Sequence, residues 1–310
     1  MKRCVLLLLA LLSACAQPDP LEGIPCGMLM LAEMPVTMAG GVPLVLVTIA
    51  GRPATMVLDT GAQRTLLTKS AVTRLGLRSD ARQITVISGV GGSSRNFPTI
   101  LTGFNVGGQR LADQTALALP FDLPSIAGLT VDGLLGVDVL GRFELDLDLP
   151  HRRVALYGGR LCPGEAIALP GPLDELPVPR INRNRLVITA KLDGTPMSAL
   201  LDTGAAGMIV MTPAMRRAGT RPESLQADPT VVLSGVGPAP VRARQHRFTS
   251  LALGSETLDH PLIEVTEPLT GDSWWQFLEP EDDDMIIGSA YLATHRFWFA
   301  YPRRRVLRQE

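Results

Sequence analysis

The chain has 310 residues, of which 46% are hydrophobic and 19% charged, so it can bury a substantial core and we expect two domains. The formal net charge of −1 and the scatter of arginines along the chain provide no basic face for a phosphate backbone, so we expect no nucleic-acid partner. Aromatic residues are scarce, and short runs of Val, Ile, Leu and Thr alternate with Gly and Pro, which favours a mainly β protein.

Residues 1–15 have the features of an export signal: a basic start and an apolar stretch, Val5 to Leu12, that is too short to span a bilayer. The stretch ends in Leu12-Ser-Ala-Cys15, which resembles the bacterial lipobox, whose cysteine is lipidated and becomes the mature N-terminus. An ordinary signal with an incidental cysteine is the alternative. We expect a protein of the bacterial cell envelope that faces the periplasm and contacts the membrane only through a lipid on Cys15. The Ala that follows this cysteine favours the outer membrane over the inner one.

Residues 16–40 are interpreted as a tether or a short pro-segment. Once the cysteines of the signal are set aside, Cys26 and Cys162 remain, and an oxidising compartment favours a disulfide between them. Such a bond would join the two ends of the first half of the chain and close a long loop. Two unpaired buried thiols are the alternative, because a sequence does not show whether two cysteines lie within bonding distance.

An internal duplication is the main organising signal. Residues 51–62 align without a gap on residues 194–205, a shift of 143 positions that brings Asp59 onto Asp202, each in an Asp-Thr-Gly-Ala motif. Two later blocks repeat in the same order: Ser88-Gly89-Val90-Gly91 as Ser234-Gly235-Val236-Gly237, and Leu134-Leu-Gly136 as Ile286-Ile-Gly288. The repeat predicts one lobe over residues 41–160 and another over 184–310, with residues 161–183, rich in Pro and Gly, as a linker.

Each half predicts the same local structure. A strand, Leu44 to Ile49 or Leu186 to Leu192, meets a tight turn at Gly51 or Gly194, and a second strand then runs into the Asp. Thr68 and Thr212 are predicted N-caps of a short helix that follows in each half, the second with Pro213 at its first position.

Asp-Thr-Gly alone is a weak signal, but the duplicated set of motifs resembles the aspartic peptidases, and among them the retropepsin-like branch, over nearly all of the mature chain. The resemblance implies a mainly β, bilobal acid-protease fold of β-barrels, with two pseudo-symmetric lobes in one chain. It also implies an aspartic endopeptidase that acts on peptide or protein substrates, works as a monomer and needs no cofactor or metal.

Asp59 and Asp202 are the predicted catalytic pair. Two adjacent carboxyls cannot both ionise, so they share one proton and together supply the base and the acid that peptide hydrolysis needs. The lack of a Cβ at Gly61 and Gly204 allows a sharp backbone turn beneath each Asp. By resemblance to the family, Thr60 and Thr203 would cross-bond between the two loops and hold the pair rigid.

The Ser88–Gly91 and Ser234–Gly237 segments lie where retropepsins carry the flap, a β-hairpin that closes over an extended substrate; a plain hairpin turn is the alternative. Ala62 and Ala205 replace the hydroxyl residue usual in pepsins, and a hydroxyl bonded to the carboxylate would lower its pKa. We therefore expect a pH optimum less acidic than that of pepsin.

Several alternatives stay open. The chain could be a peptide-binding envelope lipoprotein with the same fold and little or no turnover, or each motif could pair with its counterpart in a second chain. Trp274 and Trp275 either line a substrate subsite or pack a long loop inserted in the second lobe. The acidic run 281–284 is expected to be a solvated face.

Overall fold

The structure, a computed structural model, describes residues 26–89, 92–162, 169–182, 184–233, 235–237, 240–267 and 283–310. The expected signal and lipobox, the Trp274-Trp275 pair, and Val90, Gly91 and Ser234 of the expected flaps lie outside the described residues. In the part of the chain that the structure describes, no helix is both long and apolar enough to cross a bilayer.

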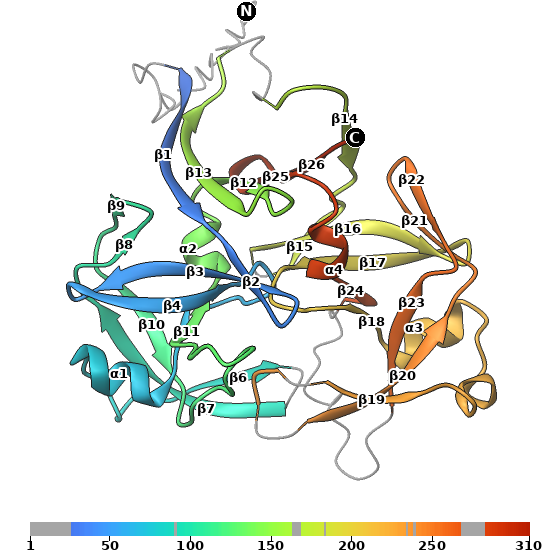
Figure 1. Ribbon diagram of the computed structural model, residues 1–310, viewed down its shortest axis with the longest axis horizontal. Helices are drawn as coiled ribbons and strands as arrows, with labels where there is room; N and C mark the ends of the chain where they lie inside the picture. Colours follow the sequence, from blue (N-terminus) through green and yellow to red (C-terminus); the bar gives the residue numbers. More distant parts are fainter. Residues whose placement is uncertain are drawn as a thin grey trace, which may run out of the picture.

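The first lobe is built on a ten-stranded sheet (Figure 1). In spatial order its strands are β6 (Thr85–Gly89), β7 (Gly92–Leu101), β10 (Gln114–Ala118), β5 (Leu66–Leu67), β11 (Gly133–Leu135), β4 (Arg52–Leu58), β3 (Val42–Ile49), β8 (Asn105–Val106) and β9 (Gln109–Arg110), with β2 (Thr37–Ala39) paired to β3.

The second lobe repeats this arrangement strand for strand. Its sheet has the order β19 (Thr230–Leu233), β20 (Val241–Arg247), β23 (Leu262–Thr266), β18 (Met208–Val210), β24 (Met285–Gly288), β17 (Thr195–Asp202), β16 (Arg185–Leu192), β21 (Ser250–Leu253) and β22 (Glu256–Asp259), with β15 (Arg180–Asn182) paired to β16. The mainly β, bilobal architecture predicted from the duplication is confirmed. Within the described residues, however, neither sheet closes into a barrel.

The hairpin that leads to each repeated Asp forms as predicted. The β3–β4 turn places Ala50 and Gly51 at φ of 49° and 74°, and the β16–β17 turn places Asp193 and Gly194 at 46° and 80°. Two consecutive residues with positive φ match the right-handed twist of the flanking strands, and glycine adopts this conformation without a steric cost. The turns therefore fix the register that carries each strand to its Asp.

The helices are short: α1 (Lys69–Leu75), α2 (Val137–Leu140), α3 (Thr212–Arg217) and α4 (Ser289–Leu292), with 3₁₀ turns η1 (Pro222–Leu225) and η3 (Tyr301–Arg303). Thr68 caps α1 as predicted, because its hydroxyl accepts a hydrogen bond from Ala71 N at 3.2 Å. The prediction for Thr212 is wrong: Met211 is the N-cap of α3, and the buried Thr212 hydroxyl donates to the Thr266 carbonyl of the neighbouring strand instead.

A six-stranded sheet joins the two lobes. Its order is β1 (Gly27–Pro35), β13 (Arg153–Arg160), β12 (Glu144–Asp148), β25 (Phe297–Ala300), β26 (Arg305–Gln309) and β14 (Leu173–Leu176). Residues 16–40, expected to be a tether or pro-segment, thus contribute β1 and β2, and the expected linker contributes β14 and β15, because all four pair with strands of the folded body. In Figure 1 this sheet lies above the two lobes, next to the C-terminus.

The hydrophobic core is continuous across the molecule. One cluster of buried side chains includes Val47 of the first lobe, Ile188 of the second and Phe299 of the six-stranded sheet. Charged groups reinforce the junction: the Arg296 guanidinium binds both carboxylate oxygens of the fully buried Asp146, at 2.7 and 2.6 Å. Separating the lobes would expose this shared core.

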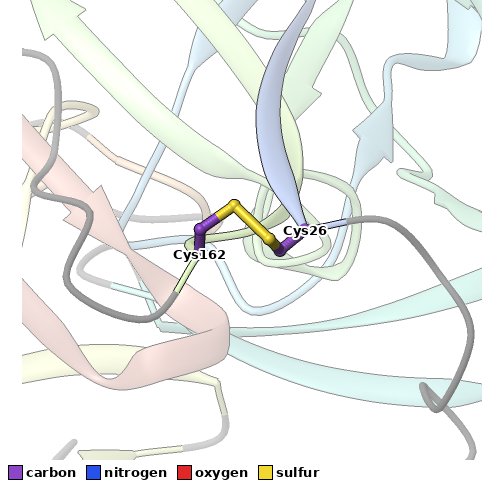
Figure 2. Close-up of a disulfide and its surroundings, with 2 residues drawn as sticks. All are labelled: Cys26 and Cys162. Atoms are coloured by element: carbon purple, nitrogen blue, oxygen red, sulfur yellow. A yellow bond between two sulfur atoms is a disulfide. The ribbon is translucent and has the colours of Figure 1, made fainter.

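A disulfide joins Cys26, at the start of β1, to Cys162, just after β13 (Figure 2). The two Cα atoms are 4.8 Å apart, and the bond closes a loop of 136 positions that contains the whole first lobe. It therefore fastens the outer strand of the six-stranded sheet to its neighbour.

Removing the disulfide by a Cys26→Ser/Cys162→Ser double substitution is expected to lower the free energy of unfolding by about 3–5 kcal/mol, because the unfolded chain regains the freedom of a long loop. Guanidinium denaturation of the oxidised wild type, the reduced wild type and the double variant measures this. Equal denaturation midpoints for all three would contradict it.

Candidate active site

Asp59 and Asp202 lie at corresponding places in the two lobes. Asp59 directly follows β4, and Asp202 is the last residue of β17. The backbone then turns so that one oxygen of each carboxylate accepts two main-chain hydrogen bonds. The Asp59 oxygen is bonded by Gly61 N at 3.0 Å and Ala62 N at 2.8 Å, and the Asp202 oxygen by Gly204 N and Ala205 N at 2.8 and 3.2 Å.

The two loops are locked to each other by their threonines. Thr60 N donates to Thr203 Oγ1 and Thr203 N donates to Thr60 Oγ1, both at 3.0 Å. Each hydroxyl in turn donates to a backbone carbonyl of the opposite lobe, Thr60 to Leu201 and Thr203 to Leu58. Both threonines are buried, so this symmetric set of bonds is shielded from competing water.

The glycines after the threonines allow the carboxylates to approach. A Cβ at Gly61 would lie 2.2 Å from Asp202 Cγ, and one at Gly204 would lie 2.5 Å from Asp59 Cγ. Any side chain at either position would occupy the space of the opposite carboxylate. The third repeated block supports the same loops from behind: Asp59 N donates to Leu135 O at 3.0 Å, and a Cβ at Gly288 would lie 2.0 Å from Gly207 O.

The electrostatics of the pair follow from burial and from like charge. The pKa of Asp59 is raised well above its usual value, first by burial and then by the negative charge of Asp202, to which it is also hydrogen-bonded. Burial likewise raises the pKa of Asp202, while backbone donors, Asp59 and the nearby Arg185 cation oppose the shift. The arrangement therefore favours one shared proton over two separate charges.

Two neighbours of the pair were missed by the sequence analysis. Arg185 N–H donates to the Gly61 carbonyl at 3.3 Å, and so reaches from the second lobe into the loop of the first. Tyr301 is buried beside the carboxylates, and the pKa of its hydroxyl is raised by burial and then by the charges of Asp59 and Asp202. Neither belongs to a duplicated motif, which is why the repeat gave no signal for them.

The expected flap segments lie at the ends of two hairpins. β6 and β7 pair up to Gly89 and Gly92, and Gly235 to Gly237 follow β19. The two hairpin ends meet, since a Cβ at Gly89 would lie only 2.4 Å from Val236 O. The Val236 side chain packs against residues of the first lobe. In Figure 1, β6 and β7 of the first lobe and β19 of the second lie together at the bottom of the view.

A hydrophobic cluster of the first lobe, separate from the main core, lies between its β6–β7 hairpin and the loop that carries Asp59. Ile87 of β6, Ala62 of the Asp59 loop and Val236 of the opposite hairpin pack against it. We call it the dyad-side cluster; its buried members are Ala39, Val42, Leu44, Val57, Leu66, Leu117, Leu119, Val131 and Leu134.

The described end of the acidic run is not a solvated face, so that prediction is wrong for Asp283 and Asp284. Asp283 is buried and binds Arg180 at 2.6 Å and Arg185 at 3.6 Å. Asp284 accepts a hydrogen bond from Ser198 N at 2.9 Å and pairs with Arg217. These carboxylates are turned inward because cations and backbone donors satisfy them there. Among the described residues, no group of three or more His, Cys, Asp or Glu side chains is arranged to hold a metal ion.

The duplicated sheets and the two facing Asp-Thr-Gly loops define this protein as an aspartic protease by its fold. A family model described as aspartyl protease matches residues 45–139 and again residues 188–291. Together these matches cover more than half of the chain, which therefore belongs to this retropepsin-like family, and the family supports a protease-type function. No curated protein matches the sequence.

The carboxyl pair makes the stability depend on pH. Because the pKa values of Asp59 and Asp202 are raised in the folded state, the folded protein binds protons more tightly than the unfolded chain. Their stabilising effect is complete below the ordinary aspartate pKa of 3.8 and is lost as the pH rises through the raised pKa values of the folded state. Asp59→Asn removes one of the two charges and with it the loss of stability at higher pH. The melting temperature of the variant minus that of the wild type should therefore increase between pH 3 and pH 7.

Thermal unfolding of the wild type, Asp59→Asn and the exposed control Asp259→Asn at a series of pH values measures this effect. A difference between Asp59→Asn and the wild type that does not vary with pH would contradict it.

Proposed function

We propose that the protein is an aspartic endopeptidase in which Asp59 and Asp202 activate one water molecule between them. The observation that carries the proposal is the contact of the two carboxyl groups, each held by two backbone donors and both with raised pKa values. A pair that retains one proton at mild pH supplies a base and an acid at the same place, as hydrolysis of an amide requires.

The reaction would proceed in two steps. The ionised carboxylate takes a proton from the water, whose oxygen attacks the scissile carbonyl carbon, while the protonated carboxyl donates its proton to the carbonyl oxygen. When the tetrahedral intermediate collapses, the C–N bond breaks and the pair returns a proton to the leaving nitrogen. The threonine bonds between Thr60 and Thr203 would keep the carboxyls in position throughout.

We propose that the substrate binds as an extended strand beneath the two hairpin ends. The contact between Gly89 and Val236 indicates that both hairpins contribute to one cover, and the glycines there would allow a peptide backbone to approach closely. The raised pKa values also favour a pH optimum less acidic than that of pepsin, as the alanines of the two motifs predict.

Asp59→Asn and Asp202→Asn should each lower kcat/KM for peptide cleavage by about 10²–10⁴-fold, because an amide neither takes nor gives the required proton. Digestion of casein and of a peptide library by the form without residues 1–15, over a range of pH and with pepstatin, measures this, with Asp259→Asn as the control. Equal cleavage by all variants would exclude the pair as the catalytic group. Peptide binding without cleavage by the wild type would identify a binding protein.

We further propose that the mature protein works as a monomer, because both motifs of the pair come from one chain. Its place would be the periplasmic side of the cell envelope, held by a lipid on Cys15, and the support for this is the sequence of the signal. Incorporation of labelled fatty acid into the wild type but not into Cys15→Ser is the expected result. Equal labelling would contradict the anchor.

A further inference from the structure

The two lobes differ in chemistry on the faces that meet at the catalytic pair. The shift of 143 positions that relates Asp59 to Asp202 also relates Leu66 of β5 to Ile209 of β18. Each of these residues pairs in parallel with the next strand of its sheet, Leu66 with Leu117 of β10 and Ile209 with Glu264 of β23. Glu264 therefore occupies in the second lobe the place that Leu117 of the dyad-side cluster occupies in the first.

A second position differs in the same way, but its charge is balanced internally. Val42 corresponds to Arg185 by the shift of 143 positions. Val131 corresponds to Asp283 by structure. The residue that follows each of these two, Asp132 or Asp284, accepts a hydrogen bond at 2.9 Å from the strand that leads to the Asp of its lobe. Arg185 and Asp283 pair at 3.6 Å. An apolar contact of the first lobe is thus replaced by an ion pair in the second.

Among the described residues, Glu264 has no such balancing charge. Its neighbours Ile263 and Val265 point into the main core, so its own side chain lies on the opposite face of β23, the face that is apolar in the first lobe. The carboxylate lies against the loop that follows Asp202, since a Cβ at Gly207 would be 2.7 Å from Glu264 Oε2.

Among the described residues the only polar side chain that acts on Glu264 is Gln245, directly opposite it on β20, which donates a hydrogen bond. Burial raises the pKa of the carboxyl, and within the described parts of the chain no cation opposes the shift. Half-buried carboxylates of this kind are stabilised strongly by a cation, because the pair is formed away from bulk water.

We propose that Glu264 is a specificity-determining residue, which makes the second lobe select a lysine or arginine side chain of the substrate while the dyad-side cluster of the first lobe selects apolar side chains. The inference rests on the proposed peptidase function. Side chains of an extended peptide point alternately to opposite sides, so one substrate can place an apolar residue against the partly buried edge of the dyad-side cluster, at Ile87, and a basic residue against Glu264.

The selectivity follows from the cost of leaving the carboxylate without a partner. A leucine of the substrate placed there would remove water from Glu264 and give it no hydrogen bond in return, whereas a guanidinium or ammonium group would replace the lost water. The carboxylate is only half-buried, so a substrate cation can reach it, and the absence of a Cβ at Gly207 leaves room for the carboxylate beside the loop that follows Asp202.

The test is a cleavage-site profile followed by kinetics on two peptides that differ only by Lys or Leu at the position the profile identifies. For the wild type we expect Lys and Arg to be enriched at one position, and kcat/KM to be about tenfold or more higher for the Lys peptide. Glu264→Gln, which keeps the size of the side chain, and Glu264→Leu, which copies the first lobe, should both lose this ratio. The exposed Glu223→Gln is the matched control and should keep it.

The results separate the two proposals. A wild type that cleaves with no basic preference, or a ratio that is unchanged in both Glu264 variants, overturns the role of Glu264 while the peptidase stands. Cleavage by the wild type that Asp59→Asn does not reduce, or no cleavage at all, counts against the peptidase and removes the basis of this inference with it. Melting temperatures of the variants show whether a variant that has lost the Lys-to-Leu ratio of kcat/KM is still folded.

Discussion

The contact between the buried Asp59 carboxyl and the partly buried Asp202 carboxyl is the constraint on which the rest of the structure depends. Asp59 and Asp202 repel each other and lose hydration, so the fold must hold them together against both effects. Four backbone donors and the reciprocal bonds of Thr60 and Thr203 do this, and Gly61 leaves room for the contact. The stabilising network is polar and local, while the hydrophobic core supports it from behind.

A duplicated chain meets this constraint economically, because one set of local rules produces both halves. The same turn delivers each strand to its Asp, and the same glycine element packs behind each loop. The six-stranded sheet then fixes the halves relative to each other with strands from both ends of the chain and from the segment between the lobes. The Cys26–Cys162 disulfide and the buried Asp146–Arg296 pair strengthen that sheet.

The repeat is maintained where the carboxyls need it and relaxed beside them. The two Asp-Thr-Gly-Ala motifs are identical, yet on the neighbouring strands Leu117 is replaced by Glu264 and Val42 by Arg185. Sharing one proton requires symmetry only within the pair itself. The surrounding faces are free to differ, and under the proposed function a substrate without two-fold symmetry would use that difference.

The sequence by itself determined the elements that depend on local chemistry: the hairpins at Gly51 and Gly194, the Thr68 cap, and the two Asp positions, because turns, caps and repeated motifs are written in neighbouring residues. Tertiary structure alone decided that β1 and β14 belong to the sheet that joins the lobes and that Asp283 turns inward to Arg180. It also decided that Arg185 reaches Gly61. These contacts join residues far apart in the chain, and their stability comes from burial and pairing that exist only once both lobes have folded.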